Sequence, residues 1–108
     1  MTGAAGLRRE PERDGGPAFA DLTAFQRDVL RVLDHDDGRK GLSIKAELES
    51  YYGTPVNHGR LYPNLDQLVD RDLVDKGQRD RRTNEYALTE TARDELARRD
   101  AWVTGGDA

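Results

Sequence analysis

The chain has 108 residues, a formal net charge of −4 at pH 7 and a sequence pI near 5.1, a length that suits one small domain and leaves no room for an elaborate enzyme. It has no cysteine, which excludes disulfides, thiolate metal sites and thiol redox switches. No run approaches 18 apolar residues and no charged-then-apolar leader opens the chain, so we expect no membrane partner and a cytoplasmic location.

Charged residues are unevenly chosen and unevenly placed. Aspartate outnumbers glutamate by 14 to 7 and arginine outnumbers lysine by 14 to 3, a composition that suggests a halophilic source. The acidic pI argues against an ordinary basic nucleic-acid binder. Residues 76–83 nevertheless carry a net charge of +3, so the rest of the chain sums to −7 and positive charge is concentrated in one segment.

Residues 1–18 combine glycines, prolines and mixed charges with almost no large apolar side chain, so they do not repay the entropy cost of ordering. We expect a flexible N-terminal arm. Its three arginines are matched by three acidic residues, which favours a plain tail over an arm that touches DNA.

A first helix should begin near Thr23 and end near His35. Thr23 and Gln26 form the T-x-x-Q pattern of a capping box. The residues expected on its core stripe are Phe25, Val29, Val32 and Leu33.

The HDDGRKG segment that follows is a turn-rich loop with glycine breakers. It superficially resembles a calcium loop, but the glycine comes one place early and Lys45 occupies the position of the chelating glutamate. We therefore expect no metal site, and we expect His35 to be simply solvated.

A second helix is expected from about Ser43, an N-cap residue type, to Gly53, which should stop it. Pro55 prevents its continuation. The residues expected to face inward are Ile44, Leu48 and Tyr51 or Tyr52. The GTPVN segment then turns the chain into a third helix, which is the helix-turn-helix plan.

The stretch from Val56 to Leu73 has one apolar face and one small-or-polar face at helical spacing. Asn57 can act as its N-cap, and Pro63 predicts a bend because its ring crowds a preceding carbonyl. The residues expected to be buried are Leu61, Leu65, Leu68 and Val69. The side expected to meet a partner carries Arg60, Asn64, Gln67 and Arg71, with Gly59 and Pro63 beside them, and His58 lies in the exposed first turn.

Arginine, asparagine and glutamine beside a glycine suit a DNA major groove, since arginine reads guanine and the two amides read adenine. The alternative for this stretch is an amphipathic helix whose polar face is merely solvated.

After Leu73 the pattern predicts a β-hairpin, with one strand at 73–78, a tip at 79–84 and a returning strand at 85–88. Three helices followed by such a hairpin make a winged helix. The cations of this wing are Lys76, Arg79, Arg81 and Arg82. They suit DNA phosphates or the minor groove, although hairpin tips are also commonly charged and solvated.

A last helix should follow Thr89, its N-cap, with Ala92, Leu96 and Val103 on one thin apolar stripe and Trp102 at its edge. So thin a stripe cannot support a free helix. We expect residues 89–104 to form a dimerisation helix, because a lone tryptophan near a chain end is often an interface anchor. The alternative is a prop packed on its own domain, and residues 105–108 should fray.

The segment HGRLYPNLDQLVDRDLV, followed by Tyr86, Ala87, Leu88, Thr89 and Glu90, resembles the PadR-like family of winged-helix transcriptional regulators, with its G-x-[L/I]-Y-P-x-L-x-x-L signature. The likeness covers roughly 22–96 and the acidic composition is similar to the haloarchaeal branch. It implies a dimer that binds a two-fold-related DNA site and usually represses transcription. It also implies help in dimerisation from residues before the first helix, here Phe19 and Leu22.

The expected fold is thus mainly α with a small β-hairpin (α+β), with a winged helix-turn-helix domain at 19–88. The expected function is a dimeric DNA-binding transcriptional repressor without a cofactor, and inorganic cations bridging carboxylates to phosphates are a further hypothesis. The expected DNA contacts are Asn57, His58, Gly59, Arg60, Asn64, Gln67, Lys76, Arg79, Arg81 and Arg82; the expected dimer contacts are Phe19, Leu22, Leu96, Trp102 and Val103. The rival is a winged-helix protein-interaction module that does not bind DNA. An enzyme is not expected, since no nucleophile and base pair is recognisable.

Overall fold

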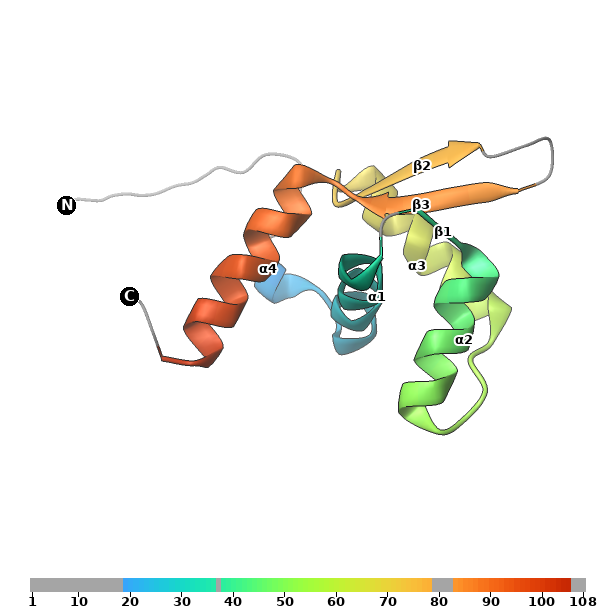
Figure 1. Ribbon diagram of the computed structural model, residues 1–108, viewed down its shortest axis with the longest axis horizontal. Helices are drawn as coiled ribbons and strands as arrows, with labels where there is room; N and C mark the ends of the chain where they lie inside the picture. The colour runs from blue at the N-terminus through green and yellow to red at the C-terminus, as the bar shows by residue number, and fades with distance from the viewer. Residues whose placement is uncertain (1–18, 37, 79–82, 106–108) are drawn as a thin grey trace.

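The computed structural model describes residues 19–36, 38–78 and 83–105. The expected arm at 1–18, the wing residues Arg79, Arg81 and Arg82, and the tail residues 106–108 lie outside this range. The elements in chain order are η2 (Phe19–Asp21), α1 (Ala24–His35), β1 (Arg39–Lys40), α2 (Gly41–Tyr52), α3 (His58–Asp70), β2 (Val74–Gln78), β3 (Asn84–Leu88) and α4 (Glu90–Val103) (Figure 1).

The strands form one antiparallel sheet in the order β1-β3-β2. Strands β2 and β3 are the predicted hairpin, paired from Val74 opposite Leu88 to Gln78 opposite Asn84. The short strand β1 was not expected. It pairs Arg39 with Tyr86, a contact between residues far apart in sequence that no local pattern in the loop reveals.

Three of the four α-helices in the described part of the chain begin where their caps were predicted. Thr23 and Gln26 make both bonds of the capping box at α1. The Asn57 side chain accepts from the Gly59 N–H at α3, and the Thr89 side chain accepts from the Ala92 N–H at α4. These side chains satisfy backbone donors that a helix start leaves without partners.

Helix α2 does not begin at Ser43, the start that the sequence predicted. It begins two residues earlier, at Gly41, and its N-cap Lys40 makes no side-chain capping bond. A Cβ at Gly41 would overlap the ring of Tyr62 on α3, so a glycine is needed for the close packing of the two helices. Its end was predicted correctly, since Gly53 has a left-handed φ of 72° and closes the helix.

The core lies where α1, α2 and α3 meet under the sheet. The side chains of Leu61, Leu65 and Leu68 on α3 are fully buried, as predicted, whereas Val69 is half-buried at the edge. Of the two tyrosines at the end of α2, Tyr52 packs on the core and Tyr51 is 80% exposed. Helix α3 runs without interruption through Pro63.

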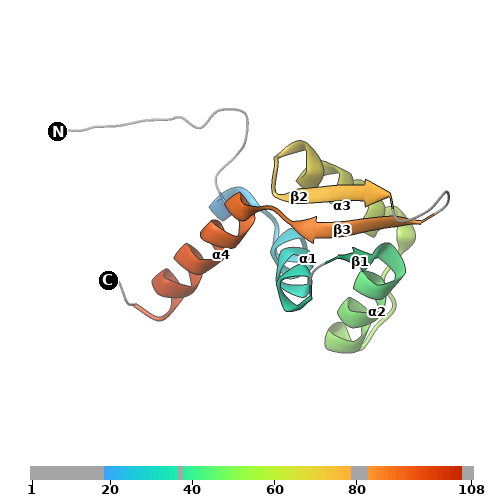
Figure 2. The same cartoon turned by 45° about the horizontal axis from the view of Figure 1, so that its top comes forward.

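Helix α4 leaves the sheet beside α1 and extends away from α2 and α3, which Figures 1 and 2 both show. Thr89 fixes its start, because its N–H donates to the Leu73 carbonyl and its hydroxyl donates to the Asp72 carbonyl. Further along, Arg31 of α1 donates to Asp100 at 2.6 Å. The expected mainly α fold with a wing and a C-terminal helix is therefore confirmed.

Candidate nucleic-acid interface

The first turn of α3 is its most open part. Asn57, His58, Gly59 and Arg60 are all exposed, and the Asn57 side-chain oxygen accepts the Gly59 N–H at 2.6 Å. The His58 ring stacks on the Tyr62 ring with centroids 5.6 Å apart. The cap therefore holds the helix end in place while leaving its backbone accessible.

Arg60, Asn64 and Gln67 lie together on the flank of α3 that faces α1. The Arg60 guanidinium sits over the Phe25 ring, 4.0 Å from its centroid, which is a cation–π contact. Asn64 is half-buried, and its Nδ2 donates to the Arg60 carbonyl at 2.7 Å. This arrangement brings three of the predicted base-reading side chains to one strip of surface.

Gln26 of α1 holds two of these side chains, which the sequence reasoning missed. Its Nε2 donates to Asn64 Oδ1 and to Gln67 Oε1, each at 3.0 Å. The capping-box pattern placed Gln26 at the start of α1, but its bonds to residues 38 and 41 positions away are visible only in the folded chain. Gln26 is one of the few buried polar residues, with 3% of its surface exposed.

The exposed surface of α3 also carries two carboxylates that the sequence reasoning did not weigh. Asp66 and Asp70 are exposed beside Gln67. The Lys76 ammonium of β2 lies 3.7 Å from an Asp66 carboxylate oxygen, so the base of the wing is beside α3. Arg79, Arg81 and Arg82 belong to the segment between β2 and β3 that lies outside the described residues.

A hollow of about 300 Å³ lies between the start of α2, α3 and the base of the wing. Its lining residues are Lys40, Gly41, Leu42, Tyr62, Thr83, Asn84 and Tyr86. Lys40 and Tyr62 were not among the expected contacts. Lys40 lies near Tyr62 of α3 because β1 pairs with β3 and because Gly41 allows α2 to approach Tyr62 closely, two features set by tertiary packing.

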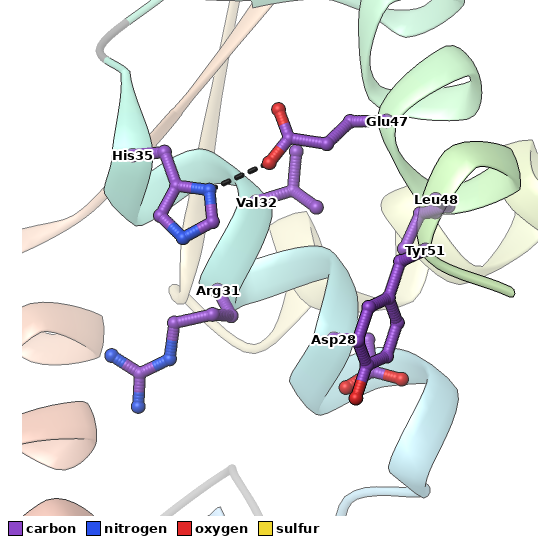
Figure 3. Close-up of a pocket in the computed structure, with 7 residues that line it drawn as sticks. All are labelled: Asp28, Arg31, Val32, His35, Glu47, Leu48 and Tyr51. Atoms are coloured by element: carbon purple, nitrogen blue, oxygen red, sulfur yellow. Dashed lines mark hydrogen bonds and ion pairs between the residues drawn. The ribbon is translucent and has the colours of Figure 1, made fainter.

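A second hollow, of about 270 Å³, separates α1 from α2 (Figure 3). On its rim His35 Nδ1 lies 2.6 Å from a Glu47 carboxylate oxygen, which corrects the expectation of a simply solvated His35. Arg39 donates to the other oxygen of Glu47. The hydrogen bond with Arg39, and to a lesser extent the one with His35, lowers the pKa of the Glu47 carboxyl below its ordinary value.

The expected dimer residues divide into two groups. Phe19, Leu22 and Leu96 are buried in the protomer's own core, whereas Trp102 and Val103 are 75% and 59% exposed. A groove of about 290 Å³ runs beside Trp102, lined by Phe19, Ala20, Glu95, Arg98, Arg99 and Trp102. Of the five expected dimer residues, the three buried ones therefore support this surface from within, and the two on the last turn of α4 face solvent.

Residues 29–98 match the model of the Transcriptional regulator PadR-like family. The chain belongs to this family. Membership confirms that the chain is a winged-helix transcriptional regulator. No curated protein sequence matches the chain significantly.

Solved structures of the haloarchaeal regulator RosR are similar to this PadR-like chain. The H. salinarum RosR structure grown from NaBr is 54% identical over 82% of this chain and 82% of its own, with a TM-score of 0.76. The complex designated hsRosR-S1 is 55% identical over 80% of this chain and 76% of its own, with a TM-score of 0.77.

A mutant MarR from E. coli, complexed with operator DNA, is more distant. It is 25% identical over 73% of this chain and 54% of its own, with a TM-score of 0.62. Within the part of the chain that the structure describes, no helix is long and apolar enough to span a bilayer. The same part holds no group of three or more His, Asp or Glu side chains placed to bind a metal ion.

Proposed function

We propose that this chain binds double-stranded DNA as a homodimer, with α3 in the major groove, and that it represses transcription. Residues 19–88 form the DNA-binding unit and 89–104 the dimerisation helix. The observation that carries the proposal is the strip formed by Arg60, Asn64 and Gln67 on an exposed helix, with Lys76 of the wing beside the same helix. The likeness to a MarR complexed with operator DNA supports it.

The proposed interface makes two kinds of contact with DNA, one to base edges and one to phosphates. Base edges are contacted by Arg60, Asn64 and Gln67. The residues at the N-terminal tip of α3 lie near the DNA backbone; they are Asn57, His58 and Gly59. Lys76, Lys40 and the wing residues Arg79, Arg81 and Arg82 contact phosphates. In a dimer the two α3 helices reach half-sites about 34–36 Å apart, one turn of B-DNA.

The carboxylates on α3 modify this picture. Asp66 and Asp70 are exposed on the proposed DNA-facing helix and repel phosphates at low salt. Inorganic cations between these carboxylates and the DNA offset that repulsion. Binding to a preferred duplex therefore persists at molar potassium chloride, where release of counterions contributes little.

The acidic surface of α3 also favours one rival, a winged-helix module that docks on a protein. Binding to a random duplex pool separates the two proposals. A DNA-reading protein enriches related sequences from the pool, whereas a protein-interaction module with a net charge of −4 enriches none.

Arg60→Ala tests the role of α3 within the DNA proposal. We expect it to weaken binding to the enriched duplex by about 1 to 3 kcal/mol and to relax the preference at one base pair. The control Arg31→Gln removes the same charge from α1, where the guanidinium pairs with Asp34 and Asp100. Fluorescence titrations against single-base variants of the duplex measure both effects, and unchanged selectivity in Arg60→Ala excludes Arg60 from base reading.

A further inference from the structure

The Gln26 side chain is unusual in using every polar hydrogen of its amide inside the protein. Its Oε1 accepts the Thr23 N–H at 3.1 Å, and the two hydrogens of its Nε2 go to Asn64 Oδ1 and Gln67 Oε1. Only 3% of the residue is exposed. Gln26 therefore joins the start of α1 to the proposed DNA-facing flank of α3 through hydrogen bonds that use its oxygen and both hydrogens of its nitrogen.

The direction of this amide is set by the helix cap. A backbone N–H needs an acceptor, so the oxygen of Gln26 must face Thr23 and its nitrogen must face α3. A nitrogen donor in turn requires acceptors, so Asn64 and Gln67 must both point their oxygens back toward α1. The orientation of three amides follows from one backbone hydrogen bond.

The outward face of the strip consequently carries donors. Gln67 is exposed and its Nε2 is the end left to point away from Gln26. One hydrogen of Asn64 Nδ2 goes to the Arg60 carbonyl and the other stays available. The Arg60 guanidinium is a donor in any orientation. Because of Gln26, the three polar side chains of the strip all present hydrogen-bond donors on the outward face.

Base edges in the major groove differ in whether they present hydrogen-bond donors or acceptors. Guanine presents two acceptors, N7 and O6, and thymine presents O4, whereas adenine presents N7 beside a 6-amino donor. The paired contact of an Asn or Gln amide with adenine needs a free carbonyl to accept from that amino group. Because both oxygens point toward Gln26, neither Asn64 nor Gln67 can turn its carbonyl to the 6-amino group without giving up its bond to Gln26.

We propose that Gln26 is a specificity-determining positioning residue, which fixes Asn64 and Gln67 as donors so that α3 selects guanine or thymine edges over adenine. This proposal depends on the proposed function, since it presupposes that α3 lies in the groove. It also replaces the expectation from sequence that the two amides read adenine.

Gln26→Glu inverts the arrangement. A glutamate at this position keeps the capping box, because one carboxylate oxygen still accepts the Thr23 N–H. The other oxygen can only accept, so the Gln67 amide turns its nitrogen inward and its carbonyl toward the groove. We expect the preferred base at the Gln67 position to change from guanine or thymine to adenine or cytosine, with relative affinities shifting on the order of tenfold.

The experiment selects bound duplexes from a random pool with the full-length wild type and with Gln26→Glu, after circular dichroism and thermal melting have verified folding. The companion variant Gln67→Ala identifies the base pair that Gln67 contacts. A switch of preference at that pair supports the proposal. If Gln26→Glu folds and keeps the wild-type preference there, the proposal is overturned. If the wild type itself enriches no sequence, the proposed function fails instead.

A second measurement needs no variant at Gln26. In the enriched duplex, each adenine is replaced in turn by purine, which lacks the 6-amino group, and each guanine by 7-deazaguanine, which lacks the N7 acceptor. We expect a loss on the order of fivefold or more for 7-deazaguanine at contacted positions and none for purine. A comparable loss for purine at the pair identified by Gln67→Ala overturns the proposal even if Gln26→Glu does not fold.

Discussion

Tyr52 and Arg60 both lie against the side chain of Phe25. The Tyr52 ring centroid lies 6.3 Å from that of Phe25, and the Arg60 guanidinium lies over the same Phe25 ring. The Tyr52 hydroxyl donates to an Asp28 carboxylate oxygen at 2.6 Å. Burial first, and this hydrogen bond second, raise the pKa of Tyr52 from 10.0 to about 12.

The raised pKa predicts a loss of stability in alkali. The neutral phenol is favoured in the folded state, so its contribution is fully present below pH 10 and is lost as the pH rises toward 12. We expect a contribution of about 1 to 2 kcal/mol. Urea unfolding between pH 9 and pH 11.5 measures the loss, and Tyr52→Phe should flatten it. Tyr51→Phe, at a residue 80% exposed, is the control; an equally steep profile in Tyr52→Phe contradicts the assignment.

At the scale of elements, the turn between α3 and β2 sets how α3 meets the wing. Asp72 has a φ of 61°, in the left-handed region that is costly for residues with a Cβ. The Leu73 N–H donates to the Leu68 carbonyl, and the Asp72 carbonyl accepts from the Thr89 hydroxyl. The strained residue therefore sits where α3, β2 and α4 are tied together.

Asp72→Gly should consequently stabilise the fold by about 0.5 to 1 kcal/mol, because glycine adopts this φ freely and the backbone bonds remain. Asp72→Val should destabilise it by more than about 1 kcal/mol. The same pair at Asp75, an exposed residue in extended β2, should rank the other way, with valine the more stable. Thermal melting of the four variants tests the order, and a glycine at 72 less stable than wild type contradicts the strain.

The helix ends show which features of the fold are encoded locally. Thr23, Asn57 and Thr89 cap neighbours two or three residues away, so their roles could be predicted from the sequence. The start of α2 could not, because it depends on the fit of Gly41 against Tyr62. The strand β1 was missed for the same reason, since its partner lies in β3.

The candidate site divides along the same line. The periodicity of α3 places its leucines inside and leaves Arg60 and Gln67 outside, and both follow from helix geometry alone. The tie from Gln26 to Asn64 and Gln67 depends on how α1 crosses α3, which no spacing within either helix specifies. The residue types in the strip were therefore predictable, whereas their outward presentation of hydrogen-bond donors was not.

At the scale of the whole molecule, the exposed Trp102 lies near the end of α4, which extends away from α3 and its proposed DNA strip (Figure 1). The exposed end of α4 carries Trp102, with the Arg99 guanidinium 5.7 Å from the Trp102 ring. Figure 1 shows α4 on the opposite side of α1 from α2. A second chain docked at this end would leave α3 and the wing of both protomers free, which is the arrangement that a two-fold DNA site requires.

Trp102→Ala should therefore weaken dimerisation without unfolding the protomer. Trp102 makes its ring contact with Arg99 and is 75% exposed, so the melting temperature at low protein concentration should change little. A buried tryptophan anchor is worth about 2 kcal/mol or more, which corresponds to at least a thirtyfold rise in the dimer dissociation constant. Sedimentation equilibrium measures that constant, with Tyr51→Ala as the control for loss of an exposed aromatic ring. The variant should also lose the tight binding to a duplex with two half-sites while keeping the weaker binding to a single half-site.

A Trp102→Ala protein that retains the wild-type dissociation constant places the dimer interface elsewhere, and a wild type that stays monomeric at all concentrations contradicts the dimer itself.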